Sequence, residues 1–372
     1  MENLLEGVEV EWVPLNKVVK TVTAPTKVKK EIYREKGKIP IIDQGITFIA
    51  GYTDEDLEPV NEDDYIVFGD HSEHIKYVDF AFIQGADGLK ILKSKFANTK
   101  YVYYAFVNFY QKELNYKRHW SSAKETLIPI PCPDNPEKSL EIQAKIVRIL
   151  DTFTELTAEL TAELTAELTA RKKQYNYYRE QLLTFEKGEV EWKPLGKIAD
   201  YEQPTKYLVK STNYSDNFDT PVLTAGKTFI LGYTDEISGI YSASKSPVII
   251  FDDFTTANKW VDFDFKAKSS AMKMITSKNE SKVLLKYIYY WINTLPNDLI
   301  VGDHKRQWIS NYSNKLIPIP PLGEQTRIVS ILDKFEALTS SITEGLPREI
   351  ELRQKQYEYY RNMLFSFPKE GV

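Results

Sequence analysis

The stretch LTAELTAELTAELTA, from Leu156 to Ala170, decides how this chain is organised. Its leucines recur every four residues, and neither Gly nor Pro occurs from Glu137 through Lys187. Because Leu, Ala and Glu favour helices, the run predicts one helix far longer than an ordinary globular helix. On a helix of about 3.6 residues per turn, a spacing of four makes the leucine row drift around the axis. We therefore expect a spacer helix; the alternative is a core helix whose repeat expanded by chance. The spacer residues are Leu156, Leu160, Leu164 and Leu168.

Composition sets the class of protein. With 372 residues, 42% of them hydrophobic, the chain is long enough for two or three domains. No apolar run approaches the roughly 18 residues of a membrane span, and the N-terminal MENLLEGVEVEW is acidic, unlike a signal peptide. We expect a cytoplasmic protein that does not enter a membrane. One cysteine, Cys132, and four scattered histidines give no disulfide and no metal-binding pattern.

The chain contains two copies of one unit of about 180 residues. GITFIAGYTDE, which begins at Gly45, returns as GKTFILGYTDE from Gly226. The other matched pairs follow in the same order: GVEVEWVPLNKV (7–18) and GEVEWKPLGKI (188–198), YIVFGD (65–70) and VIIFDD (248–253), YVDFAF (77–82) and WVDFDF (260–265), KYVYY (100–104) and KYIYY (286–290), LIPIP (127–131 and 316–320), IVRILDTF (146–153) and IVSILDKF (328–335), KQYNYYR (173–179) and KQYEYYR (355–361). The duplication predicts a pseudo-twofold arrangement with two similar faces.

Each copy combines a globular part with a helical part. Short aromatic, β-rich runs and a few helical segments predict an α+β globule, and the last ~45 residues of each copy are helical. The domains are then 1–138 and 188–322, followed by helical regions at 139–187 and 323–372. Gly345 and Pro347 should break or kink the second helix.

The two helical regions should pack side by side. Their apolar rows match, since Leu338, Ile342, Leu346 and Ile350 fall at the positions of the spacer leucines. A globule between them must return the chain, so we expect an antiparallel pair. The C-terminal KEGV resembles the join EKGEVEW and the N-terminal EGVEVEW. This predicts a nearly circular arrangement, with the N-terminal strand beside the end of the second helix.

Catalytic motifs are missing from the sequence. It holds no GxxxxGK[ST] loop for nucleotide hydrolysis, and neither a Gly-rich S-adenosylmethionine loop nor an NPPY-like motif of a methyltransferase. Pro133-Asp134 followed by Glu137-Lys138 has the wrong spacing for a PD-(D/E)xK nuclease. We therefore expect neither catalytic residues nor a cofactor in this chain.

Basic residues cluster in the same part of both copies, although the net charge of the chain is -5. Eight Lys/Arg stand against two Glu from Leu89 to Glu125, and nine against three acidic residues from Lys266 to Lys315. Such groups suit DNA, because Lys and Arg contact phosphates and Gln pairs with adenine. The alternative is a solvated surface strip over an aromatic core. The candidate DNA contacts are Lys90, Lys117, Arg118 and Lys124 in the first copy and Lys273, Lys305, Arg306 and Gln307 in the second.

The GYTDE loops add Tyr52 and Tyr233 as candidate DNA contacts. A motif identical in both copies cannot distinguish two half-sites, so a scaffold turn is the other interpretation. Residues that recognise bases should lie where the copies diverge. The divergent pairs are 56–63 with 237–244 and 70–77 with 253–260.

Aromatic and basic residues end both helical regions. Exposed Tyr and Arg are favoured at protein interfaces, so these residues are candidates for docking a partner protein. Packing between the helices and the globules is the alternative. The candidates are Tyr175, Tyr178, Arg179, Tyr357, Tyr360 and Arg361.

Over its whole length the chain resembles the specificity (S, or HsdS) subunits of type I restriction-modification systems. The resemblance rests on the EWxPL openings, the LIPIP turns before IVxILDxF helices, the KQYxYYR tails, and TAEL tetrads like those of the IC subgroup. It implies two α/β target recognition domains that bind the halves of a split sequence in double-stranded DNA, with paired helices as a ruler.

The resemblance also implies partners. Two methyltransferase subunits would bind the helical regions, followed by motor-nuclease subunits, and S-adenosylmethionine, ATP and Mg would belong to those partners. One competing hypothesis is a scaffold that joins two identical subunits without binding DNA. The other is an enzyme such as a nuclease, for which the sequence offers no residues.

Overall fold

The computed structural model describes residues 7–85, 88–115, 117–186, 188–226, 228–295, 306–340 and 344–367. The chain forms two compact units, each with a globule and parts of the long helices. Unit 1 is Met1–Glu163 with Ile350–Val372, and unit 2 is Leu164–Glu349. The units therefore divide inside the helical regions, at the TAEL repeat on one side.

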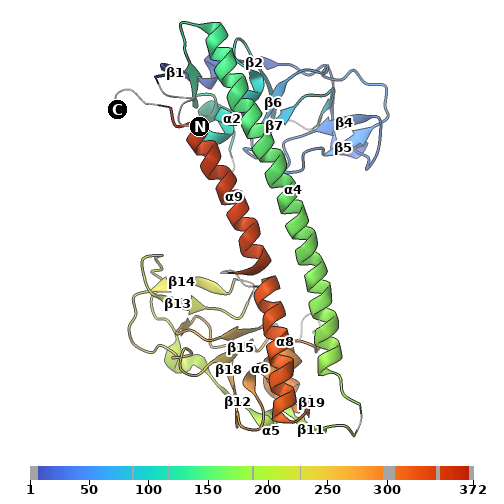
Figure 1. Ribbon diagram of the computed structural model, residues 1–372, viewed down its shortest axis with the longest axis vertical. Helices are drawn as coiled ribbons and strands as arrows, with labels where there is room; N and C mark the ends of the chain where they lie inside the picture. The colour runs from blue at the N-terminus through green and yellow to red at the C-terminus, as the bar shows by residue number, and fades with distance from the viewer. Residues whose placement is uncertain are drawn as a thin grey trace. The chain divides into compact units, whose positions relative to one another are not determined.

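Unit 1 contains three small sheets, and helix α2 packs against two of them, whereas β4 and β5 of the third sheet lie away from it (Figure 1). Their strand orders are β1-β10, β2-β9-β6-β7 and β3-β8-β4-β5, with β8 parallel to β3 and to β4. The elements are β1 (Val10–Pro14), α1 (Leu15–Val18), β2 (Val19–Val22), β3 (Lys27–Val28), η2 (Lys30–Ile32), β4 (Ile39–Ile42), β5 (Gly51–Thr53), β6 (Tyr65–Gly69), β7 (Ile75–Val78), β8 (Ile83–Gly85), β9 (Leu89–Ser94), α2 (Thr99–Phe109), α3 (Trp120–Ala123), β10 (Leu127–Pro131) and the start of α4 (Pro136–Leu183).

Unit 2 repeats this plan with strand orders β11-β19, β12-β18-β15-β16 and β14-β13-β17. Its elements, after the end of α4, are β11 (Glu191–Pro194), α5 (Leu195–Ile198), β12 (Ala199–Glu202), η3 (Pro204–Tyr207), β13 (Thr220–Leu223), β14 (Ile230–Thr234), β15 (Val248–Asp252), β16 (Asn258–Val261), β17 (Lys266–Ala267), β18 (Met272–Ser277), α6 (Leu285–Ile292), α7 (Gln307–Ser310), η4 (Tyr312–Asn314), β19 (Leu316–Ile319), α8 (Leu322–Ser340) and α9 (Gly345–Leu364), whose last part belongs to unit 1.

The repeated motifs join each globule to its helix. In unit 1 the EWVP strand pairs with LIPIP, so that Trp12 lies opposite Pro129. The buried Tyr101 hydroxyl donates to the Pro129 carbonyl at 2.7 Å, and Tyr104 donates to Asp151 of α4, also at 2.7 Å. The corresponding bonds in unit 2 run from Tyr287 to Pro318 (2.9 Å) and from Tyr290 to Asp333 (2.5 Å). Each globule is thus anchored to the helix that follows it.

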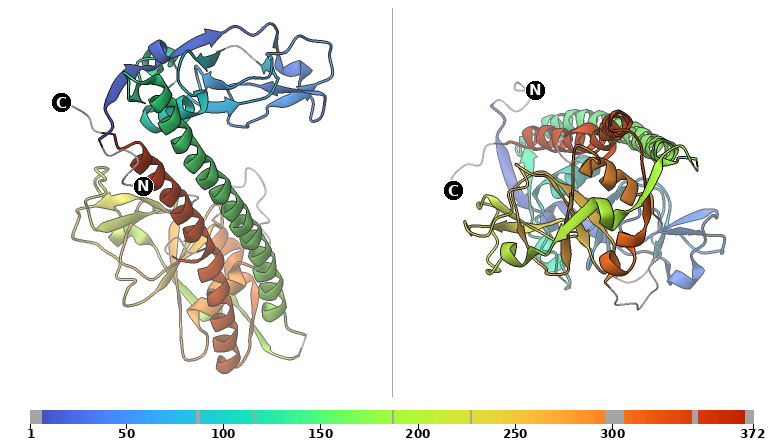
Figure 2. Two further views of the ribbon diagram at one scale, coloured as in Figure 1. Left: turned by 45° about the horizontal axis from the view of Figure 1, so that its top comes forward. Right: turned by 90° about the horizontal axis from the view of Figure 1, so that it is seen from below.

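Aromatic stacking pairs the helices in each unit. In unit 1, Phe153 of α4 stacks on Tyr360 of α9 with ring centroids 5.2 Å apart. In unit 2, Phe335 of α8 stacks on Tyr178 of α4 at 5.6 Å. The paired helices are antiparallel in each unit. Figures 1 and 2 show α4 beside α9 in unit 1 and beside α8 in unit 2. The predictions of a paired, antiparallel helical region and of an α+β duplication are confirmed.

The second helical region is broken, as predicted. α8 ends at Ser340 and α9 begins at Gly345. Gly345 has φ +78, and a β-carbon there would lie 2.4 Å from the Ala337 carbonyl oxygen, so only glycine fits. Leu338, Leu346 and Ile350 are half-buried, whereas Ile342 lies outside the described residues.

The end of α9 joins the core of unit 1. Leu364, Phe365 and Phe367 are buried there, and residues of the N-terminal strand, including Trp12, pack against the same cluster. Leu183 at the end of α4 is buried in the core of unit 2 in the same way. The expected neighbourhood of the N-terminal strand and the last helix is therefore present within unit 1.

Candidate nucleic-acid interface

Two hairpin turns, Asp70–Glu73 after β6 and Asp253–Thr256 after β15, share one backbone framework. In unit 1, Gly69 N donates to His74 O, and Gly69 O accepts from Glu73 N. In unit 2, Asp252 N donates to Ala257 O, and Asp252 O accepts from Thr256 N. All four distances are 2.8 to 3.0 Å. The last turn residue has a positive φ, 55° at Glu73 and 59° at Thr256. Left-handed backbone is costly for a residue other than glycine, above all for a β-branched one. The fold thus holds the same strained turn twice.

In unit 1 an aspartate ties this turn to the basic group KRHW. The Asp70 carbonyl accepts from His119 N at 2.8 Å, and its carboxylate accepts from Trp120 N at 2.8 Å. Both bonds hold the two residues that directly follow Lys117 and Arg118, which are exposed. The basic pair therefore lies next to the turn.

Unit 2 has the same arrangement, in which one aspartate accepts two hydrogen bonds from the backbone of the basic group. We call this arrangement the aspartate clamp in both units. The Asp253 carbonyl accepts from Gln307 N at 2.8 Å, and its carboxylate accepts from Trp308 N at 2.8 Å. Arg306, the residue before this pair, is exposed. The clamp was not predicted, although its aspartates end the matched YIVFGD and VIIFDD runs and its tryptophans end the two basic groups.

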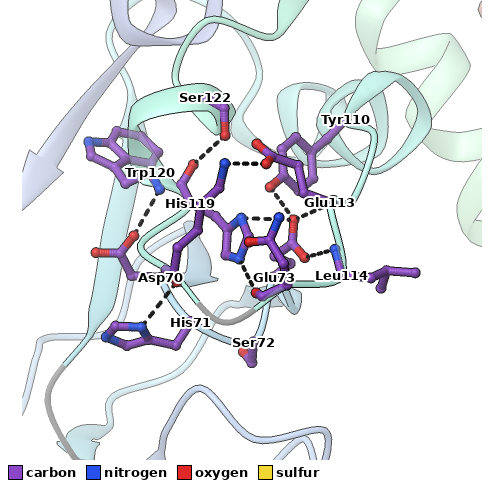
Figure 3. A network of polar contacts seen from close by, with 12 residues as sticks. Asp70, His71, Ser72, Glu73, Tyr110, Glu113, Leu114, His119, Trp120 and Ser122 are labelled. Atoms are coloured by element: carbon purple, nitrogen blue, oxygen red, sulfur yellow. Dashed lines mark hydrogen bonds and ion pairs between the residues drawn. The ribbon is translucent and has the colours of Figure 1, made fainter.

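Glu73 organises the segment that leads to the basic pair of unit 1 (Figure 3). The residue is 2% exposed, and its carboxylate accepts from the Tyr110 hydroxyl at 2.6 Å, from Glu113 N at 2.8 Å and from Leu114 N at 2.9 Å. His119 Nδ1 lies 3.3 Å from the same carboxylate. Burial by itself raises the pKa of Glu73, but these hydrogen bonds and the nearby imidazole outweigh it and leave the pKa below its usual value.

We expect Glu73→Gln to destabilise the chain by about 1–3 kcal/mol near neutral pH, because it weakens hydrogen bonds to a buried charged acceptor. Since the pKa of Glu73 is lowered by folding, its contribution is complete above the ordinary value of 4.5 and is lost as the pH falls through the lower folded value. Urea unfolding across this range should therefore show the two proteins converging in acid. Glu125→Gln, at an exposed residue paired with Lys124 at 3.7 Å, is the control and should change little. Equal midpoints for Glu73→Gln and the unchanged chain at neutral pH would contradict the assignment.

Two of the predicted DNA contacts, Lys273 and Gln307, are buried, which counts against them. Lys273 of β18 is fully buried, with its ammonium 3.5 Å from the carboxylate of Asp253, so it cannot reach a phosphate. Gln307 is 8% exposed, and its side-chain oxygen accepts from Asn311 at 3.2 Å. Both side chains lie inside the clamp region, and neither is available to a base edge.

The other basic candidates differ in exposure. Lys90, the counterpart of Lys273, is half-buried on β9, and Lys124 is half-buried beside Glu125. Lys117 is exposed and forms an ion pair with Glu113. Lys305 lies outside the described residues. The exposed basic side chains at the clamps are therefore Lys117 and Arg118 in unit 1 and Arg306 in unit 2 among the described residues.

The GYTDE segments were predicted as loops, but their Gly-Tyr-Thr residues lie in strands β5 and β14, and only the Asp-Glu that follows leaves the strand. Tyr52 and Tyr233 are half-buried on edge strands β5 and β14. The glycines that precede these tyrosines leave room for another tyrosine side chain, which packs directly against each glycine. A β-carbon on Gly51 would lie 2.9 Å from Tyr33 Cβ, and one on Gly232 would lie 2.8 Å from Tyr214 Cβ. The motif is thus explained by packing, and contacts of Tyr52 and Tyr233 with DNA stay a prediction.

A comparison with protein families matches the model described as the type I restriction modification DNA specificity domain, over residues 7–170 and 187–352. The two matched stretches cover most of the chain, one for each copy. The chain belongs to this family.

Relatives of the specificity family extend over different parts of the chain. The specificity subunit of the type I restriction enzyme EcoR124I/EcoR124II of Escherichia coli is 65% identical, over 52% of this chain and 48% of that protein. The chain thus spans about half the length of this relative in the match. A putative type I restriction enzyme specificity subunit of Haemophilus influenzae is 36% identical over 99% of this chain and 98% of that protein.

Two solved structures share the fold of this specificity-family chain. The S subunit of a type I restriction-modification system from M. genitalium has a TM-score of 0.54 at 14% identity and covers 98% of both chains. A chain from a study of complex assembly and conformational transition of the type I R-M system has a TM-score of 0.57 at 13% identity, over 96% of this chain and 97% of that one. At these identities the likeness supports the fold alone.

The predicted docking residues of this specificity-family chain pack mainly on its own helices. Besides the two ring stacks, Thr154 donates to the Tyr357 hydroxyl at 3.1 Å, and Tyr175 contacts Phe335. Arg179 and Arg361 lie over the rings of Tyr175 and Tyr357, and Arg361 also donates to Asn108. The packing interpretation therefore accounts for Tyr175, Tyr178, Arg179, Tyr357, Tyr360 and Arg361. Tyr177 and Tyr359, at matched positions, are the outward members, 60% and 64% exposed.

The spacer leucines lie on one uninterrupted helix. Leu156 is 48% exposed, and Leu160, Leu164 and Leu168 are half-buried. The repeat spans the point where the two units divide, between Glu163 and Leu164. None of the helices in the described part of the chain has the length and apolarity that a membrane crossing requires.

Proposed function

We propose that this chain is the DNA-recognition subunit of a type I restriction-modification complex and that each globule recognises one half of a split target. The observation that carries the proposal is the aspartate clamp, which occurs in both units with the same hydrogen bonds. It holds exposed basic residues, suited to phosphates, beside a turn whose side chains differ between the copies. Two different half-sites require phosphate contacts that are the same in both units and base contacts that differ between them, and the clamp with its turn offers this combination.

Partners and catalysis follow from the same proposal. Tyr177 and Tyr359 are equivalent exposed residues on the helical regions, so two identical methyltransferase subunits could each bind one of them. Motor-nuclease subunits would complete the restriction complex. S-adenosylmethionine, ATP and Mg would be bound by these partners, and this chain would supply sequence recognition and spacing.

Neutralising the clamp cations tests DNA recognition. We expect Lys117→Gln with Arg118→Gln to weaken duplex binding by the chain with its methyltransferase partner, and to lower the slope of log K against log salt by up to about 2. Arg306→Gln should lower it by about 1 in unit 2. Such losses should be similar for all DNA sequences, because phosphates carry no sequence information.

The control changes two exposed lysines of α4, Lys138→Gln with Lys145→Gln, and should leave the salt dependence unchanged. If neither clamp variant alters DNA binding by the complex, DNA recognition through these faces is excluded. The alternative, a scaffold that joins two partner subunits without binding DNA, would then be favoured.

A further inference from the structure

The same turn position carries chemically different side chains in the two units. Because the turns share their hydrogen bonds, their positive φ and their clamp, His71 in unit 1 corresponds to Phe254 in unit 2. Both residues directly follow the clamp aspartate. Whatever lies against these turns therefore meets an imidazole in one unit and an apolar ring in the other.

Phe254 is held outward by the backbone around it. The Asp252 carboxylate accepts from Phe254 N at 2.9 Å and from Thr255 N at 2.8 Å, which fixes the start of the turn. The ring is nevertheless 40% exposed. The ring is therefore accessible to a ligand and is presented from a rigid, strained turn.

Exposed basic residues on elements next to the turn suit nucleic acid as the occupant. Asp253, which directly precedes Phe254, accepts a hydrogen bond from the backbone N–H of Gln307. Arg306 directly precedes Gln307 in the chain and is exposed. Lys259 is exposed on the following strand. A hollow of about 390 Å³, lined by Thr255, Lys259 and Asn293 among others, lies beside the turn. An apolar ring with exposed basic residues on neighbouring elements suits a base edge close to phosphates.

We propose that Phe254 contacts the 5-methyl group of a thymine in the half-site that unit 2 recognises. The thymine methyl is the apolar group that base pairs expose in the major groove, and Phe is one of the side chains that contact it. His71, at the same position of unit 1, is polar and selects a different base there. The inference rests on the proposed function and names the residue and the base through which unit 2 acts.

Uracil substitution tests the contact, because uracil differs from thymine by that methyl group alone. Once methylation mapping has defined the unit 2 half-site, each thymine in it is replaced by uracil in a duplex bound by the chain with its methyltransferase partner. We expect one replacement to weaken binding about tenfold with the unchanged chain. With Phe254→Ala the same replacement should have no effect, whereas Phe254→Leu should keep part of it.

Leu316→Ala is the matched control, since Leu316 is an apolar residue of unit 2 that is 53% exposed on β19, and it should keep full sensitivity to uracil. Equal sensitivity of the unchanged chain and Phe254→Ala at every position would overturn the inference, as would a half-site without thymine. A complex that binds all duplexes equally would instead refute the proposed function. Thermal unfolding of Phe254→Ala shows separately whether the unit remains folded.

Discussion

Deleting one tetrad, Thr161 to Leu164, should abolish methylation at the original target and create a target whose two half-sites are closer by about one base pair. The deletion keeps the leucine row in register, since the repeat is four residues long. It falls where the two units divide. The half-site sequences should not change, because each is recognised by a globule that the deletion leaves intact.

Helix and duplex geometry explain why one tetrad should correspond to about one base pair. Four residues lengthen a helix by ~6 Å and rotate it by a net ~40°. One base pair advances ~3.4 Å along DNA and rotates by roughly 35°. The rotations nearly agree, and a helix oblique to the DNA axis would project only part of its 6 Å along it. The agreement between the two rotations is therefore the reason to expect a change of about one base pair for each tetrad.

The packing of each unit should survive the deletion. The stack of Phe153 on Tyr360 belongs to unit 1, and that of Phe335 on Tyr178 belongs to unit 2. Both lie outside the deleted residues.

Mapping of methylated bases in cells that carry the chain and its methyltransferase partner gives the spacer directly. The control is Glu159→Ala with Glu163→Ala, which alters the chemistry of two tetrads at exposed positions but keeps their length. It should methylate the original target. An unchanged spacer in the deletion variant would eliminate the role of the helix as a ruler.

The sequence could predict the fold because the duplication repeats whole sets of contacts. EWxPL and LIPIP recur together since they pair as strands, with Trp12 opposite Pro129 and Trp192 opposite Pro318. Matched leucine rows and the intervening globule were enough to predict an antiparallel helix pair. Gly345 marked the break in the second region, because its backbone conformation and the close Ala337 carbonyl exclude other residues.

The burial of the candidate DNA contacts was predicted less well, because a local count of charges carries no information on burial. Lys90 and Lys273 occupy equivalent positions, yet one is half-buried and the other fully buried. Their difference depends on the neighbouring side chains, such as Tyr201 of the adjacent strand β12, whose ring lies 5.2 Å from the Lys273 ammonium. The helical spacing of the tyrosines likewise did not reveal which of them face the opposite helix.

The clamp of unit 2 should be far more sensitive to loss of its aspartate than the clamp of unit 1. Asp253→Ala removes the acceptor for Trp308 N and leaves the fully buried ammonium of Lys273 without the carboxylate 3.5 Å away. Removing one partner of a buried ion pair leaves an uncompensated buried charge, which lowers the free energy of unfolding by about 3–5 kcal/mol. Asp70→Ala is the matched control in the same chain, since Lys90 is half-buried and retains access to water. That variant loses chiefly an acceptor for a backbone N–H, which costs about 1–3 kcal/mol.

A double variant separates the charge from the hydrogen bond. Asp253→Asn with Lys273→Met removes both charges while the asparagine oxygen can still accept from Trp308 N. Because neutral groups of similar volume replace a buried ion pair at little cost, this variant should be more stable than Asp253→Ala despite its second substitution. Urea unfolding of the three variants measures the order. If Asp253→Ala is no less stable than Asp70→Ala, the buried lysine does not depend on its aspartate, and the clamp is held by the backbone bonds alone.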